Sequence, residues 1–216
     1  MDDILEKLLL LCLGWALGLL APVIVDTIRR KRENLVGQAA IQTELGEVAH
    51  KLAFATHYIH MHFGSVDREH LDWLKIRILE YKGPEQPTAV LQSVDMQLAM
   101  SSDELVAANK ALASPTGKGL RLQKYPVPIL DSRISALWSF QTTVQRRLLE
   151  IRTCLDMLNE LVARTQKLDD MTFSKHEDGN HQRVIENIDQ CYRLYAERAR
   201  ITVEHIHQLK LEIAHA

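Results

Sequence analysis

The feature that most constrains this chain is an uncharged, leucine-rich run near its N-terminus. No charged residue occurs from Leu8 to Val25. A helix rises about 1.5 Å per residue and the hydrocarbon layer of a bilayer is about 30 Å thick, so this run nearly crosses the layer. Adding Ile28, with modest thinning of the bilayer, completes the crossing. The sequence therefore predicts a single transmembrane helix over residues 8–28.

The charges on either side of this run predict its orientation. Four cations follow it directly: Arg29, Arg30, Lys31 and Arg32. Translocation of such a cluster is disfavoured, which keeps it at the cytoplasmic membrane surface and leaves residues 1–7 as a short tail outside the cytoplasm. A cleaved signal peptide is the alternative, but its first region should be basic, whereas acidic residues outnumber Lys7 there. The expected location is the inner (plasma) membrane, with the N-terminus outside and the C-terminus cytoplasmic.

Composition favours one ordinary domain beside this anchor. A hydrophobic content of 46% supports a packed core. The formal net charge of -2 gives no general attraction to phosphate backbones, which argues against nucleic acid as a partner. The 3 cysteines have neither paired nor metal-type spacing, so no disulfide framework or zinc site is indicated and a reducing compartment fits best.

Hydrophobic periodicity predicts an all-α fold for residues 29–216, with long helices over residues 30–62, 132–168 and 181–214. In each, apolar residues recur every three or four positions, as in a helix that buries one stripe. The pattern is clearest in the second, where Asp131 or Ser132 is expected to cap the helix. The three long helices predict an elongated up-and-down bundle extending away from the membrane.

Shorter helices are predicted over residues 66–81, 88–100 and 102–113. In the first, Leu74, Ile76 and Ile78 alternate with basic residues as in a strand, so a strand is the alternative. We favour a helix, because a lone strand would have no evident partner. Ser101 and Glu104 form a capping-box pattern before the third. Residues 114–130, interrupted by prolines and glycines, are expected to form an extended loop.

Two features suggest contacts between copies or with a partner. Gly14 and Gly18 form a GxxxG pattern, which lets two helix backbones approach closely in lipid and predicts a dimer face. Glycine is also frequent in membrane helices, so the spacing can arise by chance. A second contact face is indicated by apolar residues beside the main stripes: Trp138, Phe140, Leu149 and Leu161. Coverage of these side chains within the same molecule is the equal alternative.

The chain contains 10 histidines, and two pairs have Glu-x-x-His spacing: Glu47 with His50, and Glu204 with His207. In di-iron bundles this spacing places both ligands on one inward helix face. Here the phase argues against a metal centre, because a core stripe through Leu45 and Leu52 leaves His50 on the opposite, solvent-facing side. The same test places Glu204 and His207 away from the core. No cofactor is therefore predicted.

His57 and His60 lie one turn apart and are a further candidate site. The two imidazoles could chelate a metal, or could sense pH because imidazole titrates near neutrality. The phase of the helix places His57, like His50, opposite the core stripe. A polar helix end with solvent-facing histidines is the simpler interpretation.

The loop 114–130 has a local basic character. Lys118, Arg121 and Lys124 are basic, and no acidic residue occurs between Glu104 and Asp131. Such a loop could rest on anionic lipid or contact a nucleic-acid phosphate, since both need only well-placed cations. A solvated loop is the simpler alternative.

Together these patterns predict a membrane-anchored helical interaction, scaffold or signalling module that self-associates or docks a cytoplasmic protein. A non-enzymatic role is favoured, because long apolar stripes are suited to helix contacts and no catalytic constellation has the right phase. Two alternatives stay open. One is a metal-dependent, di-iron-like oxidoreductase that uses the Glu-x-x-His pairs, and the other is a membrane-acting toxin or immunity-type effector.

Overall fold

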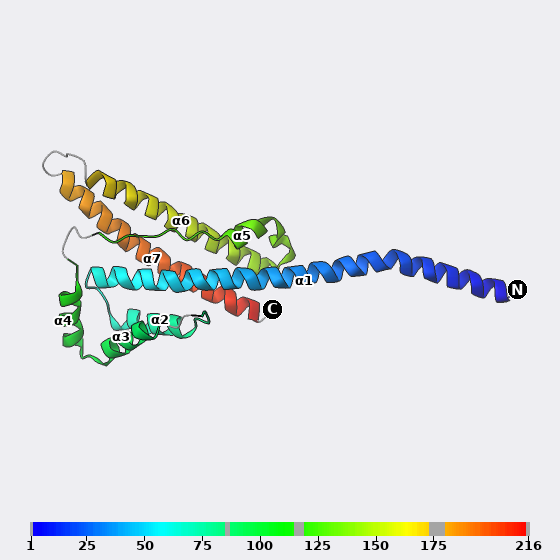
Figure 1. The fold of residues 1–216 in the computed structure, drawn as a ribbon, viewed down its shortest axis with the longest axis horizontal. Helices are drawn as coiled ribbons and strands as arrows, with labels where there is room; N and C mark the ends of the chain where they lie inside the picture. Colours follow the sequence, from blue (N-terminus) through cyan, green and yellow to red (C-terminus); the bar gives the residue numbers. More distant parts are fainter. Residues whose placement is uncertain (1, 85–86, 115–118, 173–179, 215–216) are drawn as a thin grey trace. The chain divides into compact units, whose positions relative to one another are not determined.

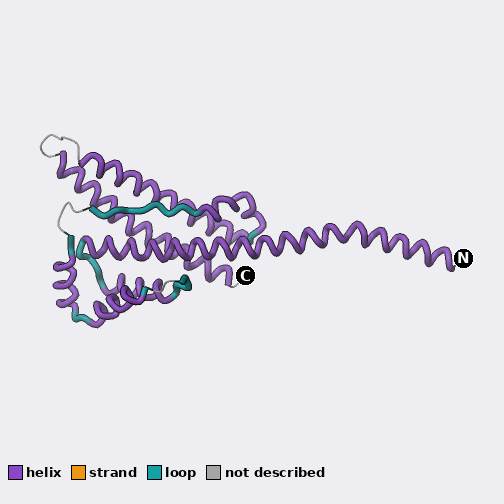
Figure 2. The backbone as a smooth tube through the Cα atoms, viewed as in Figure 1, coloured by secondary structure: helices purple, strands orange, loops and turns teal. Residues whose placement is uncertain are grey.

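The computed structural model describes residues 2–84, 87–114, 119–172 and 180–214, where helices joined by loops are present and no strand occurs (Figure 2). The all-α prediction is confirmed for this part of the chain. The elements are α1 (Asp2–His62), α2 (Arg68–Leu79), α3 (Thr88–Ala99), α4 (Ser102–Leu112), α5 (Pro128–Arg133), the 3-10 helix η1 (Ile134–Ser139), α6 (Thr142–Thr172) and α7 (Asn180–Ala214). The chain divides into two compact units, Met1–Gln42 and Thr43–Ala216.

The first unit consists of the N-terminal part of α1. The helix continues through Pro22 without ending there. Among the residues whose side chains are described, no helix combines the length and the apolar character that a membrane crossing requires. The predicted segment 8–28 is therefore confirmed as helix, while its placement in a membrane stays a prediction.

In the second unit, α1 ends at the predicted position. Gly64 has a φ of 59°, a left-handed conformation that glycine adopts without steric cost. The amide of Ser65 donates to the carbonyl of His60 and that of Gly64 to Met61, which is the paired hydrogen-bond pattern of a Schellman helix end. Helix α4 lies close by, because the carbonyl of Asn109 would be 3.0 Å from a Cβ at position 64.

The core of the second unit lies along α6 and α7, which pack side by side (Figure 1). The predicted stripe of α6 is buried from Val144 to Thr165. In α7 residues buried every three or four positions include Ile188, Tyr192, Tyr195 and Ala199, and the neighbouring Cys191, Ala196 and Val203 are buried as well. The heptad pattern thus identified the core faces of both helices.

The segment 66–81, for which a strand was the alternative, is helical from Arg68 to Leu79. Its buried residues Leu71, Leu74 and Ile78 recur every three or four positions, as on one helix face. The carboxylate of Asp67 accepts a hydrogen bond of 2.7 Å from the amide of His70 and caps α2, which packs against α3. The predicted capping box between Ser101 and Glu104 is present at the start of α4.

The predicted long helix over residues 132–168 is wrong at its start, and the loop 114–130 ends earlier than predicted. Pro128 begins α5, whose first free amides at Ile129 and Leu130 each donate 2.9 Å hydrogen bonds to the carboxylate of Glu44. Asp131 is not a cap, since its carboxylate accepts a 2.9 Å hydrogen bond from Arg152.

Phe140 then adopts an extended backbone, so α6 begins only at Thr142. The partners Glu44 and Arg152 are distant in sequence from the residues that they hold. A periodic pattern read along the chain therefore could not locate this break.

Candidate functional site

An extended segment, residues 119–127, lies between helices of the second unit (Figure 2). Backbone polar groups of such a segment need partners, because no sheet supplies them. The hydroxyl of Tyr192 accepts from the amide of Leu120 at 2.8 Å and donates to its carbonyl at 2.7 Å. The amide of Tyr125 donates to Asn159 at 3.0 Å. Side chains of α6 and α7 therefore hold the segment in place.

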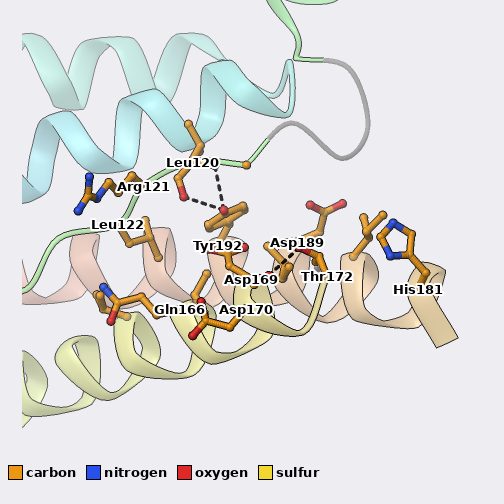
Figure 3. Close-up of a pocket in the computed structure, with 15 residues that line it drawn as sticks. Leu120, Arg121, Leu122, Gln166, Asp169, Asp170, Thr172, His181, Asp189 and Tyr192 are labelled. Atoms are coloured by element: carbon orange, nitrogen blue, oxygen red, sulfur yellow. Dashed lines mark hydrogen bonds between the residues drawn. The ribbon is translucent and has the colours of Figure 1, made fainter. Parts of the chain in front are cut away.

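On one side of this segment lies a cleft of about 650 Å³, which we call the acidic cleft (Figure 3). It is bounded by residues 119–122, the C-terminal part of α6 and the N-terminal part of α7. Leu122, Val162 and Ile188 form an apolar wall, and Tyr192 closes one side. A cleft of this size suits a small ligand or a few side chains of a partner.

Three carboxylates give the acidic cleft its charge: Asp169, Asp170 and Asp189. In the described part of the chain none of the three forms an ion pair. Burial, with repulsion from Asp170, raises the pKa of the Asp169 carboxyl. Burial is also the main reason that the pKa of Tyr192 is raised to about 12, so its hydroxyl stays neutral and keeps its hydrogen bonds. The cleft therefore favours a cationic group beside an apolar one.

The basic residues predicted to form an anion-binding loop do not act as one group. Arg121 and Lys124 are exposed on the extended segment, while Lys118 lies outside the described residues. Figure 3 shows the Arg121 side chain turned away from Asp169 and Asp189. Arg121 also borders a second pocket, on the α1 side of the segment, that contains Lys51.

Both Glu-x-x-His pairs contact α2 and the residues just after it. Tyr81 donates a 2.7 Å hydrogen bond to Glu47, and its ring stacks on His50 with centroids 3.7 Å apart. The indole of Trp73 donates a 2.7 Å hydrogen bond to Glu204. The members of these pairs are half-exposed, because α2 and Tyr81 cover part of that side of α1 and α7.

His207, the histidine of the second pair, also contacts the residues that follow α2. Its Nδ1 lies 3.2 Å from a carboxylate oxygen of Glu80, which directly follows α2. His50 and His207 line one small cavity of about 30 Å³. Among the described residues, no group of three or more His, Cys, Asp or Glu side chains is arranged to hold a metal ion. The pairs thus fasten α2 to α1 and α7, and they do not form a di-iron arrangement there.

His57 corrects a further expectation, because it is buried rather than solvent-facing, with 4% of its surface exposed. Its Nδ1 lies 3.3 Å from Nε2 of the buried His70, and the His60 ring stacks on His70 at 4.2 Å. Burial, with a smaller effect of His60, lowers the pKa of His57 to about 4 and that of His70 to about 3. Both imidazoles are therefore neutral at neutral pH, and one donates to the other.

The predicted dimer face lies on an open part of the first unit. Gly14 and Gly18 are exposed, and a Cβ at either position would have no atom within 4 Å. In the basic cluster, Arg29 pairs with Glu33 at 2.9 Å, and Lys31 and Arg32 are exposed. The side chain of Arg30 lies outside the described residues.

The second predicted contact face is only partly exposed. Leu149 is 49% exposed on α6, whereas Phe140 and Leu161 are half-buried. The side chain of Trp138 lies outside the described residues.

Sequence reasoning missed the carboxylates of the acidic cleft and the cation Lys51 of the second pocket. Asp169 and Asp170 are adjacent carboxylates in the last turn of α6, and their pairing in the sequence could have indicated an acidic site. Asp189 lines the same cleft because α6 and α7 are antiparallel neighbours (Figure 1). Comparisons with protein families, with curated proteins and with solved structures found no match.

Proposed function

We propose that this chain is a membrane-anchored helical interaction module that docks a cytoplasmic protein. Its N-terminal helix lies in the inner membrane, with the N-terminus outside, and its second unit lies in the cytoplasm. The observation that carries this proposal is the exposed apolar surface of the first unit. More than half of the surface is exposed for a set of large apolar side chains: Leu10, Leu11, Trp15, Leu19, Leu20, Ile24, Val25 and Ile28.

Water is a poor solvent for such a surface. Burial of one large apolar side chain is favourable by about 1.5–3 kcal/mol, so covering the whole set is worth many times that amount. A bilayer covers every side of a helix at once, and the run from Leu8 to Val25 contains no charge that would oppose insertion. The cations from Arg29 to Arg32 then support the cytoplasmic placement of the second unit.

Docking is proposed at the acidic cleft. Its apolar wall and the carboxylates of Asp169 and Asp189 complement a partner segment that carries basic residues beside an apolar side chain. Within the described residues, no specific observation favours the oxidoreductase or the membrane-acting effector.

Cell fractionation tests the anchor. The full chain should sediment with membranes and resist alkaline extraction, and a tag at the C-terminus should be protected from protease in intact cells. The double variant Leu11→Arg/Leu19→Arg should move into the supernatant, since each arginine costs about 2.5–3.5 kcal/mol in a membrane helix. Leu149→Arg is the matched control, because Leu149 is an exposed leucine of α6. A wild-type chain in the supernatant, or a tag cut from outside, would contradict the anchor.

Site-specific photocrosslinking in cells tests the docking site. A photoreactive residue at Gln166, which lines the acidic cleft, should give a discrete protein adduct. Asp169→Asn and Asp189→Asn should lower its yield. The same residue at Gln190, exposed on α7 and outside the cleft, is the control. Equal adduct yields at Gln166 and Gln190 would reject the cleft as the docking site. A yield at Gln166 that does not change in Asp169→Asn and Asp189→Asn would reject it as well.

A further inference from the structure

A second pocket lies on the other side of the extended segment from the acidic cleft, and we call it the aromatic pocket. Its volume is about 330 Å³. Helix α1 contributes Lys51, Phe54 and Tyr58, and the extended segment contributes Arg121, Leu122 and Tyr125. All of these residues belong to the second unit.

The walls of the aromatic pocket are suited to a flat or slender apolar group. Tyr58 is 53% exposed, and Phe54 and Tyr125 are half-buried, so three rings are accessible to a ligand. Aromatic faces stack on other rings and pack against aliphatic chains. Burial raises the pKa of Tyr125, whose phenol therefore stays neutral.

The charges at the pocket are all of one sign. Lys51 and Arg121 are exposed, and in the described part of the chain neither forms an ion pair. None of the described residues that line the pocket is acidic. Arg121 borders both cavities, but its side chain is turned away from the carboxylates of the acidic cleft, which lie on the opposite side of the segment (Figure 3). One strip of backbone thus separates a pocket that favours anions from a cleft that favours cations.

The volume limits the size of the ligand. About 330 Å³ is near the lower end of the range for small-molecule sites, about 300–1,000 Å³. At about 30 Å³ for each water-sized group, it holds a body of about ten non-hydrogen atoms. A free small molecule of this size fits the space.

We propose that the aromatic pocket binds a small free carboxylate with an aromatic or short aliphatic body. The body lies among the rings of Phe54, Tyr58 and Tyr125. The carboxylate lies at Lys51 and Arg121, and the planar guanidinium is able to bind both of its oxygens. This site needs neither the anchor nor a docked protein, so it stands or falls separately from the proposed function.

Binding is measured by isothermal titration calorimetry on the full chain in nanodiscs of uncharged lipid, with empty nanodiscs as the blank. The probes are 3-phenylpropionate, its alcohol analogue 3-phenylpropanol and its amine analogue 3-phenylpropylamine. The carboxylate should bind with a dissociation constant below about 1 mM, the alcohol at least tenfold more weakly, and the amine more weakly still. This order follows because only the carboxylate gains the contacts with both cations.

Variants then locate the site. Arg121→Gln and Lys51→Gln should each weaken carboxylate binding about tenfold and bring it closer to that of the alcohol. Lys124→Gln is the matched control, because Lys124 is an exposed cation of the same segment that does not line the pocket, and it should leave the affinity unchanged. All three residues are exposed, and circular dichroism checks that the variants keep their helix content.

Three results would overturn the proposal. The first is no carboxylate binding up to about 10 mM, and the second is amine binding as tight as carboxylate binding. The third is an affinity that falls equally in Lys124→Gln and Arg121→Gln, which would indicate attraction to the whole surface instead of to one pocket.

Discussion

Two buried histidines, His57 and His70, contribute a specific pH dependence to the fold. The imidazole nitrogens lie 3.3 Å apart, and this contact needs one ring to donate and the other to accept. Protonation of either ring places a charge in a region where 4% or less of the surface of each residue is exposed. The folded state therefore resists protonation, whereas the unfolded chain does not.

Acid should destabilise the protein through this pair. In the unfolded chain each histidine takes up a proton near its ordinary pKa of 6.5, while in the fold the pKa values are about 4 and about 3. Below pH 6.5 the unfolded state thus binds more protons, so the free energy of unfolding decreases as the pH falls toward 4. The expected loss is up to about 1.4 kcal/mol per pH unit for each histidine. Urea unfolding followed by circular dichroism at pH 7, 6 and 5 measures it.

The variant His57→Gln/His70→Gln separates this pair from other acid effects. It should be less stable at pH 7, but its unfolding free energy should change much less between pH 7 and 5. His181→Gln, at an exposed histidine, should keep the wild-type slope. An unchanged slope in the double variant would show that other groups cause the acid sensitivity.

At the level of elements, the position of the extended segment 119–127 depends on the side chain of Tyr192 in α7. Tyr192 is fully buried and satisfies both backbone polar groups of Leu120. This single side chain therefore shapes the wall that both pockets share. Loss of its hydroxyl leaves two polar groups without their partner, at a cost of about 1–3 kcal/mol.

Tyr192→Phe should loosen this wall while the helices stay folded. Trypsin cleavage after Arg121 and Lys124 should become at least about fivefold faster, because proteolysis follows the local opening equilibrium. Cleavage after Arg146, exposed on α6, should keep its rate. Tyr58→Phe is the control, since the Tyr58 ring is on the opposite side of the segment and largely exposed. Mass spectrometry of the first fragments gives the rates, and equal rates in both variants would refute a holding role of Tyr192.

At the level of the whole molecule, self-association is a question for the first unit. Gly14 and Gly18 lie on an open helix surface, with the large exposed side chains of Leu11 and Trp15 nearby in sequence. In lipid, two such surfaces gain close backbone packing. If the proposed membrane placement holds, the same surface in a monomer contacts lipid instead.

A dimer of this kind should be captured by oxidation. Gly14→Cys and Gly18→Cys should form disulfide-linked dimers in membranes, whereas Ile24→Cys, outside the GxxxG pattern, should form fewer. Gly14→Leu/Gly18→Leu should lower the dimer fraction, because leucine side chains keep the two backbones apart. We expect a decrease of about tenfold in the association constant, which corresponds to about 1.4 kcal/mol. Gel electrophoresis without reductant reads the result. Equal crosslinking at all three positions would indicate random collision.

The sequence by itself determined the features that depend on neighbouring residues. Apolar spacing identified the core faces of α6 and α7, and local hydrogen bonding determined the end of α1 at Gly64 and the cap at Ser101. Only the tertiary structure decided which outer faces are covered. Helix α2 buries His57 and contacts Glu204, and Tyr81 just after it contacts Glu47 and His50. Glu44 caps α5 from 85 residues away. The two pockets likewise bring together residues of separate elements. Periodicity reports which face of a helix is apolar, but contacts between polar side chains depend on which helices become neighbours.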